Sequence, residues 1–269
     1  RSSPRSSLFA AGFSSDIVLA WDKFESARMI DPVEKSTEVT REPRDPENAF
    51  AFEEVSENVV LDSRLGIFHR EAGWLVASDL HFGYEVSRRA AGGLWPLWGM
   101  ETIVQRLHEM VETWNPDRLI LVGDVVDSAA APREAIAWLG TLHELGPELI
   151  LIEGNHDRGE VRRAFDFLPS YQSGQFFFHH GHLDWCPRDT EKWIEVTGHF
   201  HPSVRFADGA GTSLRLPALT RERFAEGGEL WRLPAFSPWA AGHPTRPTEQ
   251  TSEFQEWACG GGRIIKVDK

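Results

Sequence analysis

The sequence predicts a layered α/β fold, and two observations support that prediction. From residue 59 onward, apolar runs typical of buried strands alternate with segments of helical periodicity in the order β-α-β-α-β. This alternation is the signature of layered α/β architecture. The later half is mostly strand-like and contains two similar segments, "LRLPAL" at 214–219 and "WRLPAF" at 231–236. We expect these two segments to be neighbouring strands of a second sheet.

The first half of the pattern predicts a sheet and its helices. "RLGIFH", a turn at "REAG" and then "WLVASD" predict a β-hairpin that leads into a strand ending at Asp79. Helical spacing of apolar residues predicts a helix over 99–114, and a second helix lies between Pro132 and Gly146. Buried strands are predicted for "RLILVGD" and "ELILIEGN", and a further helix for "GEVRRAFDFL".

The second half predicts further strands with one long loop. "SGQFFFHHGH", "EKWIEVTGH" and "SVRFAD" are strand-like. The segment 240–262 is rich in Pro, Gly and Thr, which favours a loop. "RIIKVD" is predicted to be the final strand.

The N-terminal segment differs from the rest of the chain. Between Asp31 and Glu57 there are nine acidic residues against three basic ones, with little periodicity. Such a composition is typical of a solvated, partly disordered tail. We therefore divide the chain into an acidic, partly disordered extension over 1–57 and one folded domain over 58–269.

Composition excludes several classes of function. A net charge of −13 argues against a broad basic surface for nucleic acid, although a local contact stays open. The two cysteines, Cys186 and Cys259, provide no disulfide framework, which favours a reducing compartment. No apolar run approaches the roughly 20 residues of a membrane span, and Asp16 interrupts any signal-like stretch. We expect a cytoplasmic protein without a membrane partner.

Polar residues follow each of the predicted buried strands at the point where the strand ends. Asp79 and His81 follow "WLVAS", Asp124 follows "LILV", and Asn155 and His156 follow "LILIE". Open α/β sheets place their ligand sites at such carboxyl ends. These endings are therefore expected to converge on one crevice.

The residue types at these endings suit divalent metal ions. Carboxylate, imidazole and amide oxygen together bind ions such as Mn, Fe or Zn. Asp-x-His at 79–81 and His-x-His at 199–201 place two ligands on the same side of an extended chain. Seven of the eleven histidines fall in these stretches: His81, His156, His179, His180, His182, His199 and His201. Asp124 alone could be a turn residue and Asn155 alone a helix cap, but the complete set indicates a metal site.

The motifs "DLH", "GDVVD", "GNHD", "HGH" and "GHFH" resemble, in order and approximate spacing, those of the calcineurin-like metallophosphoesterases. The resemblance covers roughly residues 60–206. It implies a four-layer αββα sandwich of two mixed β-sheets flanked by helices, so that 58–269 would be a metallophosphoesterase domain. It also implies a dinuclear centre of two divalent ions, with Mn expected and Fe, Zn, Co or Ni as alternatives.

The resemblance assigns a role to each motif residue. Asp79, His81 and His201 would bind one metal ion, Asn155, His180 and His199 the other, and Asp124 would bridge both. His156 would protonate the leaving oxygen, and Asp127 would orient His156. Strand alternation lets only one of His179 and His180 face the site, and His180 matches the family ligand. His182 is either close to the site or a surface residue.

The chain "VASDLHFGYE" to "LWRLPAFSPWAAG" is further similar to a bacterial branch, the DNA ligase-associated metallophosphoesterases. This implies a phosphodiesterase that uses metal-bound hydroxide, with a role in DNA repair or end processing. The implied partners are a phosphoester substrate, nucleic acid, and a DNA ligase, helicase or nuclease. Two alternatives stay open, namely a pyrophosphate hydrolase acting on a nucleotide-sugar lipid and a non-catalytic scaffold. Tyr84, where many relatives carry Lys, departs from the branch.

Overall fold

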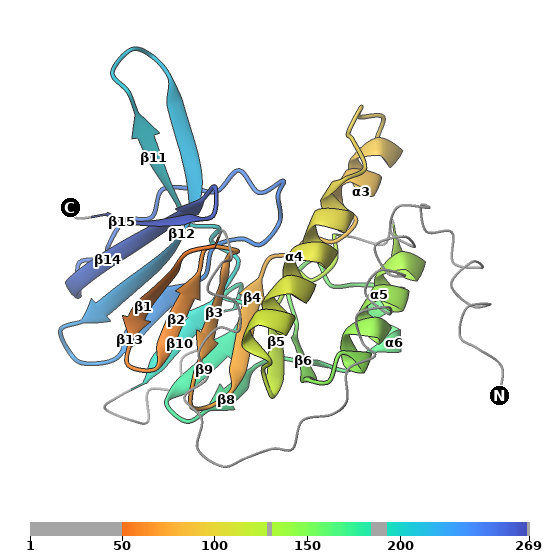
Figure 1. Cartoon of the computed structure of the whole chain (residues 1–269), viewed down its shortest axis with the longest axis horizontal. Coiled ribbons are helices and arrows are strands. Elements are labelled where there is room, and N and C mark those ends of the chain that lie inside the picture. The colour runs from red at the N-terminus through yellow and green to blue at the C-terminus, as the bar shows by residue number, and fades with distance from the viewer. Residues whose placement is uncertain (1–49, 128–130, 184–192, 268–269) are drawn as a thin grey trace.

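Two mixed β-sheets pack against each other, and helices lie beside the first sheet (Figure 1). The computed structural model describes residues 50–127, 131–183 and 193–267. The N-terminal residues 1–49, which make up most of the predicted acidic extension, lie outside this described part, as does Cys186. The prediction of an α/β fold with two mixed sheets is confirmed.

The first sheet contains seven strands in sequence order. Its strands are β1 (Phe52–Ser56), β2 (Val59–Asp62), β3 (Gly66–His69), β4 (Trp74–Ser78), β5 (Arg118–Val122), β6 (Glu148–Ile152) and β7 (Phe167–Leu168). The first four strands pair antiparallel, and β4 to β7 pair parallel. The carboxyl ends of β4, β5 and β6 therefore lie at one edge of the sheet.

Four described helices connect the strands of this sheet. They are α3 (Tyr84–Ala90), α4 (Gly99–Trp114), α5 (Pro132–Glu144) and α6 (Glu160–Ala164). The helix predicted over 99–114 is confirmed as α4, whose residues Ile103, Leu107 and Met110 are fully buried. All four helices lie on the side of the first sheet (Figure 1). Within the described ranges, the segments that connect the strands of the second sheet contain no helix. The helical layer that the predicted αββα sandwich places outside the second sheet is therefore not found among these residues.

The second sheet contains eight strands along the main path and its branch. They are β8 (Tyr171–Ser173), β9 (Phe176–His179), β10 (Ile194–Thr197), β11 (Ser203–Ala207), β12 (Ser213–Phe224), β13 (Glu229–Arg232), β14 (Thr251–Gly260) and β15 (Arg263–Val267). The order is β15-β14-β12-β13-β10-β9-β8, and β11 pairs only with β12. Strands β9, β10 and β13 are parallel to one another. The strands β12 and β13, which contain "LRLPAL" and the start of "WRLPAF", are neighbours as predicted, but the residues that pair are 220–223 with 229–232.

Three details of the sequence prediction are corrected. The expected loop over 240–262 contains β14. The Pro- and Thr-rich stretch before β14 dominated the composition, and the strand itself shows no alternating pattern, because residues 256–259 are all buried. The helix expected over 159–168 ends at Ala164, and Phe167–Leu168 pairs with β6 instead. Strand β1 pairs with β2, although it lies within the segment assigned to the extension.

Aromatic side chains form the contact between the two sheets. The ring of Trp74 in β4 lies 5.1 Å from Phe176 and 5.3 Å from Phe178, both in β9. All three side chains are buried, and burial of each contributes roughly 1.5–3 kcal/mol. The backbones also meet where Ser78 bridges to Ala235. This contact brings the strand ends of both sheets to one place.

Candidate metal centre

Each predicted metal ligand follows the carboxyl end of a parallel strand. In the first sheet, Asp79 and His81 follow β4, Asp124 follows β5, and Asn155 follows β6. In the second sheet, His180 follows β9, and His199 and His201 follow β10. The expected convergence is thus observed, and it draws ligands from both sheets.

The backbone at this site adopts a conformation that non-glycine residues rarely take. Five of the predicted ligands have positive φ angles: Asp79 (53°), His81 (46°), Asp124 (46°), His199 (68°) and His201 (43°). Left-handed conformations cost free energy and cluster at functional sites, where surrounding structure holds them. Here the tight turns direct the Asp and His side chains of these residues toward one point.

Glycines allow the ligand loops to approach each other closely. A Cβ atom on Gly198 would lie 2.6 Å from Oδ2 of Asp79, and one on Gly154 would lie 2.3 Å from Oδ1 of Asp124. Both distances are below van der Waals contact, so any side chain here would displace a carboxylate. The glycines of "GHFH" and "GNHD" are therefore required by close packing.

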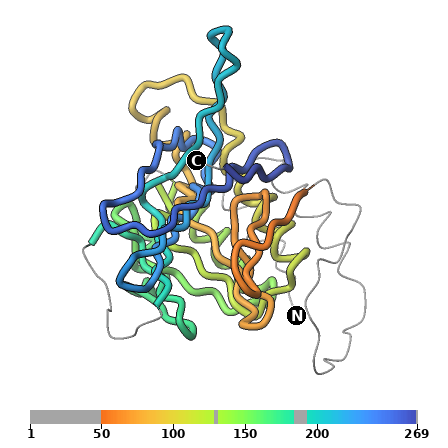
Figure 2. Tube along the Cα trace, turned by 90° about the vertical axis from the view of Figure 1, so that its left-hand side faces the viewer, coloured from red at the N-terminus to blue at the C-terminus, as the bar shows by residue number. Residues whose placement is uncertain are grey.

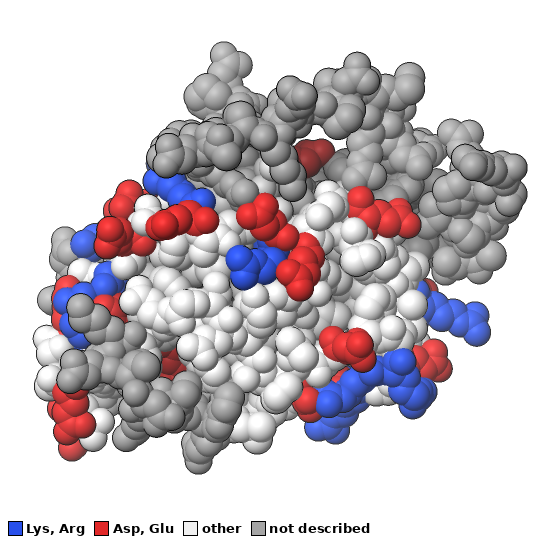
Figure 3. Space-filling view, turned by 90° about the horizontal axis from the view of Figure 1, so that it is seen from below, with Lys and Arg blue, Asp and Glu red and all other residues white. Residues whose placement is uncertain are grey.

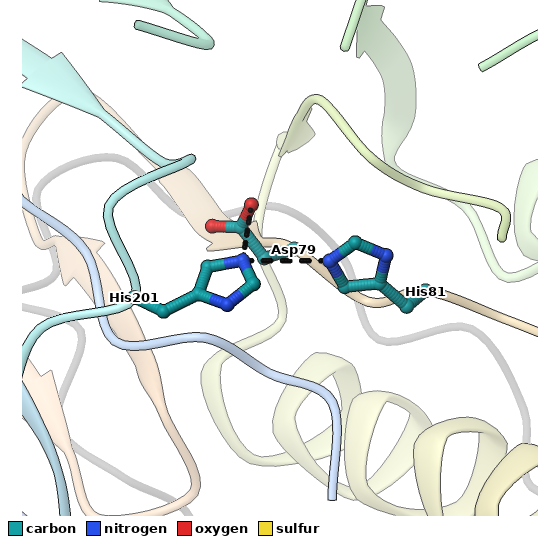
Figure 4. Close-up of side chains that lie close together, drawn as sticks. All are labelled: Asp79, His81 and His201. Atoms are coloured by element: carbon teal, nitrogen blue, oxygen red, sulfur yellow. Dashed lines mark hydrogen bonds and ion pairs between the residues drawn. The ribbon is translucent and has the colours of Figure 1, made fainter. Parts of the chain in front are cut away.

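The first ligand group consists of Asp79, His81 and His201 (Figure 4). Nε2 of His201 lies 3.1 Å from Oδ1 of Asp79 and 3.4 Å from Nε2 of His81. Two imidazole nitrogens and a carboxylate oxygen thus point at a common centre. A divalent cation accepts all three donors, so this set fits a metal ion.

The second group consists of Asp124, His180 and His199. Nε2 of His180 lies 3.3 Å from Oδ2 of Asp124 and 3.2 Å from Oδ1 of Asn155, which adds the amide oxygen to this group. Asp124 also forms a cluster with His81, whose Nε2 lies 3.9 Å from Oδ2 of Asp124. The Asp124 carboxylate therefore lies between the two groups.

Asp127 and His156 lie beside the ligands and contact each other. Nδ1 of His156 lies 3.3 Å from Oδ1 of Asp127, and the same oxygen lies 3.5 Å from Nδ1 of His81. The backbone N–H of His156 donates to Oδ1 of Asp124 at 2.8 Å. Asp127 thus contacts two imidazole rings. The sequence predicted only its contact with His156.

Neighbouring imidazoles keep the buried carboxylates ionised. Burial alone would raise the pKa of Asp124, but hydrogen bonding and charge from His180 outweigh it and lower the pKa to about 2. Asp79 has a lowered pKa as well, because His201 and His180 outweigh its burial. Burial and the proximity of His180 lower the pKa of His199, which favours the neutral ring that a metal requires.

Three supporting residues were not assigned roles from the sequence. Asp157 accepts hydrogen bonds from the backbone N–H groups of Val126 at 3.0 Å and Gly154 at 2.9 Å, and so ties two ligand loops together. Ser78 donates to Oδ2 of Asp79. The backbone N–H of Ser237 donates to the carbonyl of Asp79 at 3.0 Å. Asp157 is the last residue of the motif "GNHD", so its place in that motif could have identified it from the sequence.

The two remaining histidines of the motif region lie in different places. His179 faces away from the ligands, and its Nε2 lies 2.7 Å from Oε1 of Glu195, as strand alternation predicts. The ring of His182 lies 5.3 Å from that of His180 and 6.3 Å from that of His199. His182 is therefore close to the site, which settles the alternative left open above.

The fold and this donor set together define a metal-dependent phosphoesterase. Residues 74–230 match the family model described as calcineurin-like phosphoesterase, and the chain belongs to that family. Its domain is accordingly of the class that hydrolyses phosphoric ester bonds. None of the helices that the structure describes has the length and apolar character needed to cross a membrane.

Two similar proteins provide further comparison. A protein of Danio rerio called "Transmembrane protein with metallophosphoesterase domain" is 32% identical over 130 residues, which cover 46% of this chain and 26% of that relative. The match thus spans about a quarter of the relative's length. The crystal structure of Pseudomonas putida nuclease MPE has a TM-score of 0.56 and 21% identity, and the match covers 81% of this chain and 100% of that one. At this identity the likeness concerns the fold.

Proposed function

We propose that the protein is a phosphodiesterase with a dinuclear metal centre that acts on DNA during repair or end processing. The observation that carries the proposal is the position of Asp124, whose carboxylate belongs to clusters on both sides of the site. A carboxylate has two oxygens and could therefore coordinate one ion with each, which suits a site for two metal ions.

The proposed ligand assignment follows the two groups. Asp79, His81 and His201 would hold one ion, Asn155, His180 and His199 would hold the other, and the carboxylate of Asp124 would be shared between them. When bound, the two cations supply Lewis-acid polarisation of the phosphoryl group and acidify water. We propose Mn as the resident metal, with Fe, Zn, Co or Ni as alternatives that the same donors accept.

His156 is the proposed general acid. Its side chain is 42% exposed, so a substrate can reach it, and the hydrogen bond with Asp127 raises its pKa. A protonated imidazole donates a proton to the departing alkoxide, which is a poor leaving group without it. Asp127 fixes the tautomer and orientation of the ring.

The proposed substrate is a nucleic acid phosphodiester in the cytoplasm. The solved structure with a similar fold is named a nuclease, which supports this class of substrate. The resemblance to the DNA ligase-associated branch further supports a DNA ligase, a helicase or a nuclease as a functional partner. Family membership favours catalysis over the scaffold alternative.

A metal-reconstitution screen tests the proposal. Metal-depleted protein is loaded with Mn and assayed on phosphomonoesters, bis-p-nitrophenyl phosphate, cyclic nucleotides, short DNA and a UDP-sugar lipid. We expect two metal ions per chain and hydrolysis of the diester and DNA. His156→Ala should retain metal but lose activity on DNA. Binding of a single ion, or turnover confined to the UDP-sugar lipid, would contradict the proposal.

A further inference from the structure

The hairpin formed by β11 and β12 projects from the molecule next to the metal centre. Strand β11 begins two residues after His201, at Ser203. The hairpin extends away from both sheets in two perpendicular views (Figures 1 and 2). Its base is fixed because Ser203 donates its N–H to the carbonyl of His243 at 2.9 Å, and His243 donates to the carbonyl of His201 at 2.8 Å. The projecting strands are thus rigidly joined to a ligand loop.

Two arginines lie directly opposite each other on this hairpin. The register pairs Arg205 with Arg215, and both side chains are exposed. Like charges at directly opposed positions destabilise a sheet. Neither guanidinium forms an ion pair with a carboxylate in the described part of the chain, although the sequence has 41 acidic and 28 basic residues. The pair therefore lowers stability unless an anion binds between the two charges.

One of the two guanidiniums is already held near the metal centre. Nη1 of Arg215 donates to the carbonyl of Gly242 at 2.9 Å. Gly242 packs against the ligand loop so closely that a Cβ atom on it would lie 3.0 Å from the carbonyl oxygen of His201. This hydrogen bond occupies one N–H group and leaves the others for a ligand.

One face of the hairpin carries the two arginines, and the other face is apolar. The neighbouring cross-strand pairs, Val204 with Leu216 and Phe206 with Leu214, are apolar and lie on the other face of the hairpin. On the opposite end of the molecule, basic side chains lie beside acidic ones (Figure 3). The arginine pair is thus a local cationic site in a chain with a net charge of −13.

We propose that Arg205 and Arg215 together bind a phosphate group of the substrate strand away from the cleaved bond. This inference rests on the proposed function and adds a binding site to it. Arg205 lies four positions after His201 in the sequence, so their Cα atoms are at most about 13 Å apart in an extended strand. The bound phosphate would therefore lie a few nucleotides away from the metal centre. Guanidinium pairs bind phosphate oxygens through two parallel hydrogen bonds.

Binding and kinetics of arginine variants test this inference. We would prepare Arg205→Ala, Arg215→Ala and Arg215→Lys, with Arg223→Ala as the matched control. Arg223 lies at the far end of β12, where Glu229 and Glu253 already pair with it. Binding of fluorescein-labelled short DNA to EDTA-treated protein is measured by anisotropy over a range of salt concentrations. Hydrolysis of DNA and of bis-p-nitrophenyl phosphate is then measured with Mn.

Each alanine variant should weaken DNA binding and raise the KM for DNA about tenfold, and should reduce the salt dependence of binding by about one counterion. Turnover of bis-p-nitrophenyl phosphate should stay unchanged, because that diester is too small to reach the hairpin. Arg215→Lys should bind more tightly than Arg215→Ala, and the Arg223 control should match the wild type. Unchanged DNA binding in Arg205→Ala, or an equal loss on both substrates, would overturn the inference. Failure of the wild type on the small diester would instead refute the proposed function.

Discussion

Oδ1 of Asp127 lies 3.3 Å from Nδ1 of His156, and it lies 3.5 Å from Nδ1 of His81 as well. One carboxylate thus orients both the proposed acid and a proposed metal ligand. The effect of Asp127 on the acid and its effect on the metal ligand can be distinguished by the choice of substrate. A substrate with a good leaving group does not need a proton from His156.

Asp127→Asn is expected to reduce the rate on alkyl phosphodiesters by roughly 10²-fold or more, because the imidazole of His156 loses its orienting partner. The loss on bis-p-nitrophenyl phosphate should be much smaller. Steady-state kinetics on both substrates measure this difference. His156→Ala should show the same selectivity, and the double variant should be little worse than either single one. Equal losses on both substrates would show that Asp127 acts mainly through metal binding.

Asp124→Asn is expected to abolish occupancy of the dinuclear centre, since the shared carboxylate contributes to both groups. A ligand present at a hundredfold excess over its Kd stabilises a protein by about 2.7 kcal/mol. Mn should therefore raise the Tm of the wild type clearly and that of the variant little. Elemental analysis and thermal unfolding with Mn or EDTA provide the two measurements. Asp166→Asn, at an exposed position, is the control and should behave as the wild type.

Gly154→Ala is expected to destabilise the protein by about 1–3 kcal/mol and to lower metal affinity, because the new methyl group would overlap the Asp124 backbone and carboxylate. Gly140→Ala is the matched control. Gly140 lies within α5, and a Cβ atom there meets nothing within 4 Å. That substitution should stabilise the protein by about 0.5–1 kcal/mol. Chemical denaturation measures both, and similar behaviour of the two variants would contradict the predicted close packing.

Glu222→Gln is expected to cost about 3 kcal/mol at pH 7, because it leaves the buried Arg232 without its ion pair. Hydrogen bonds from Thr251 and Thr248 and the contact with Arg232 outweigh burial and lower the pKa of Glu222 below its usual 4.5. Its stabilisation is therefore present above pH 4.5 and lost as the pH falls toward the folded-state pKa.

The difference between wild type and Glu222→Gln should accordingly shrink as the pH is lowered below about 4. Urea denaturation at several pH values measures it. Glu253→Gln, which removes an exposed partner of Arg223, should change stability by less than about 1 kcal/mol at every pH. A difference that stays constant down to pH 3 would show that folding does not lower the pKa of Glu222.

The sequence was most informative where short-range patterns determine structure. The helix over 99–114 follows from spacing alone, and the ligand positions follow from strand ends combined with motif chemistry. Strand β14 was missed because its burial depends on pairing with β12, a contact distant in sequence. The second role of Asp127 was missed for a similar reason. The distance from Asp127 to His81 depends on how the loops after β4 and β5 lie relative to each other. The spacing of the motifs in the sequence does not determine that arrangement.

The arginine pair on the hairpin illustrates the same limit. Arg205 and Arg215 are ten positions apart, and only the register of the turn decides whether they oppose each other. A shift of one residue would place one of them on the apolar face. Such a site becomes visible only once the strand pairing is known.

The ligand set draws on both sheets, and this has a consequence for biosynthesis. Asp79, Asp124 and Asn155 leave the ribosome before His199 and His201, because they come earlier in the chain. A nascent chain that stops short of β10 lacks one of the proposed donors to each ion, His201 for the first and His199 for the second, however well its first sheet has formed. On the proposed ligand assignment, binding of the metal ions is thus a late event of maturation, and it links segments of the chain that are synthesised at different times.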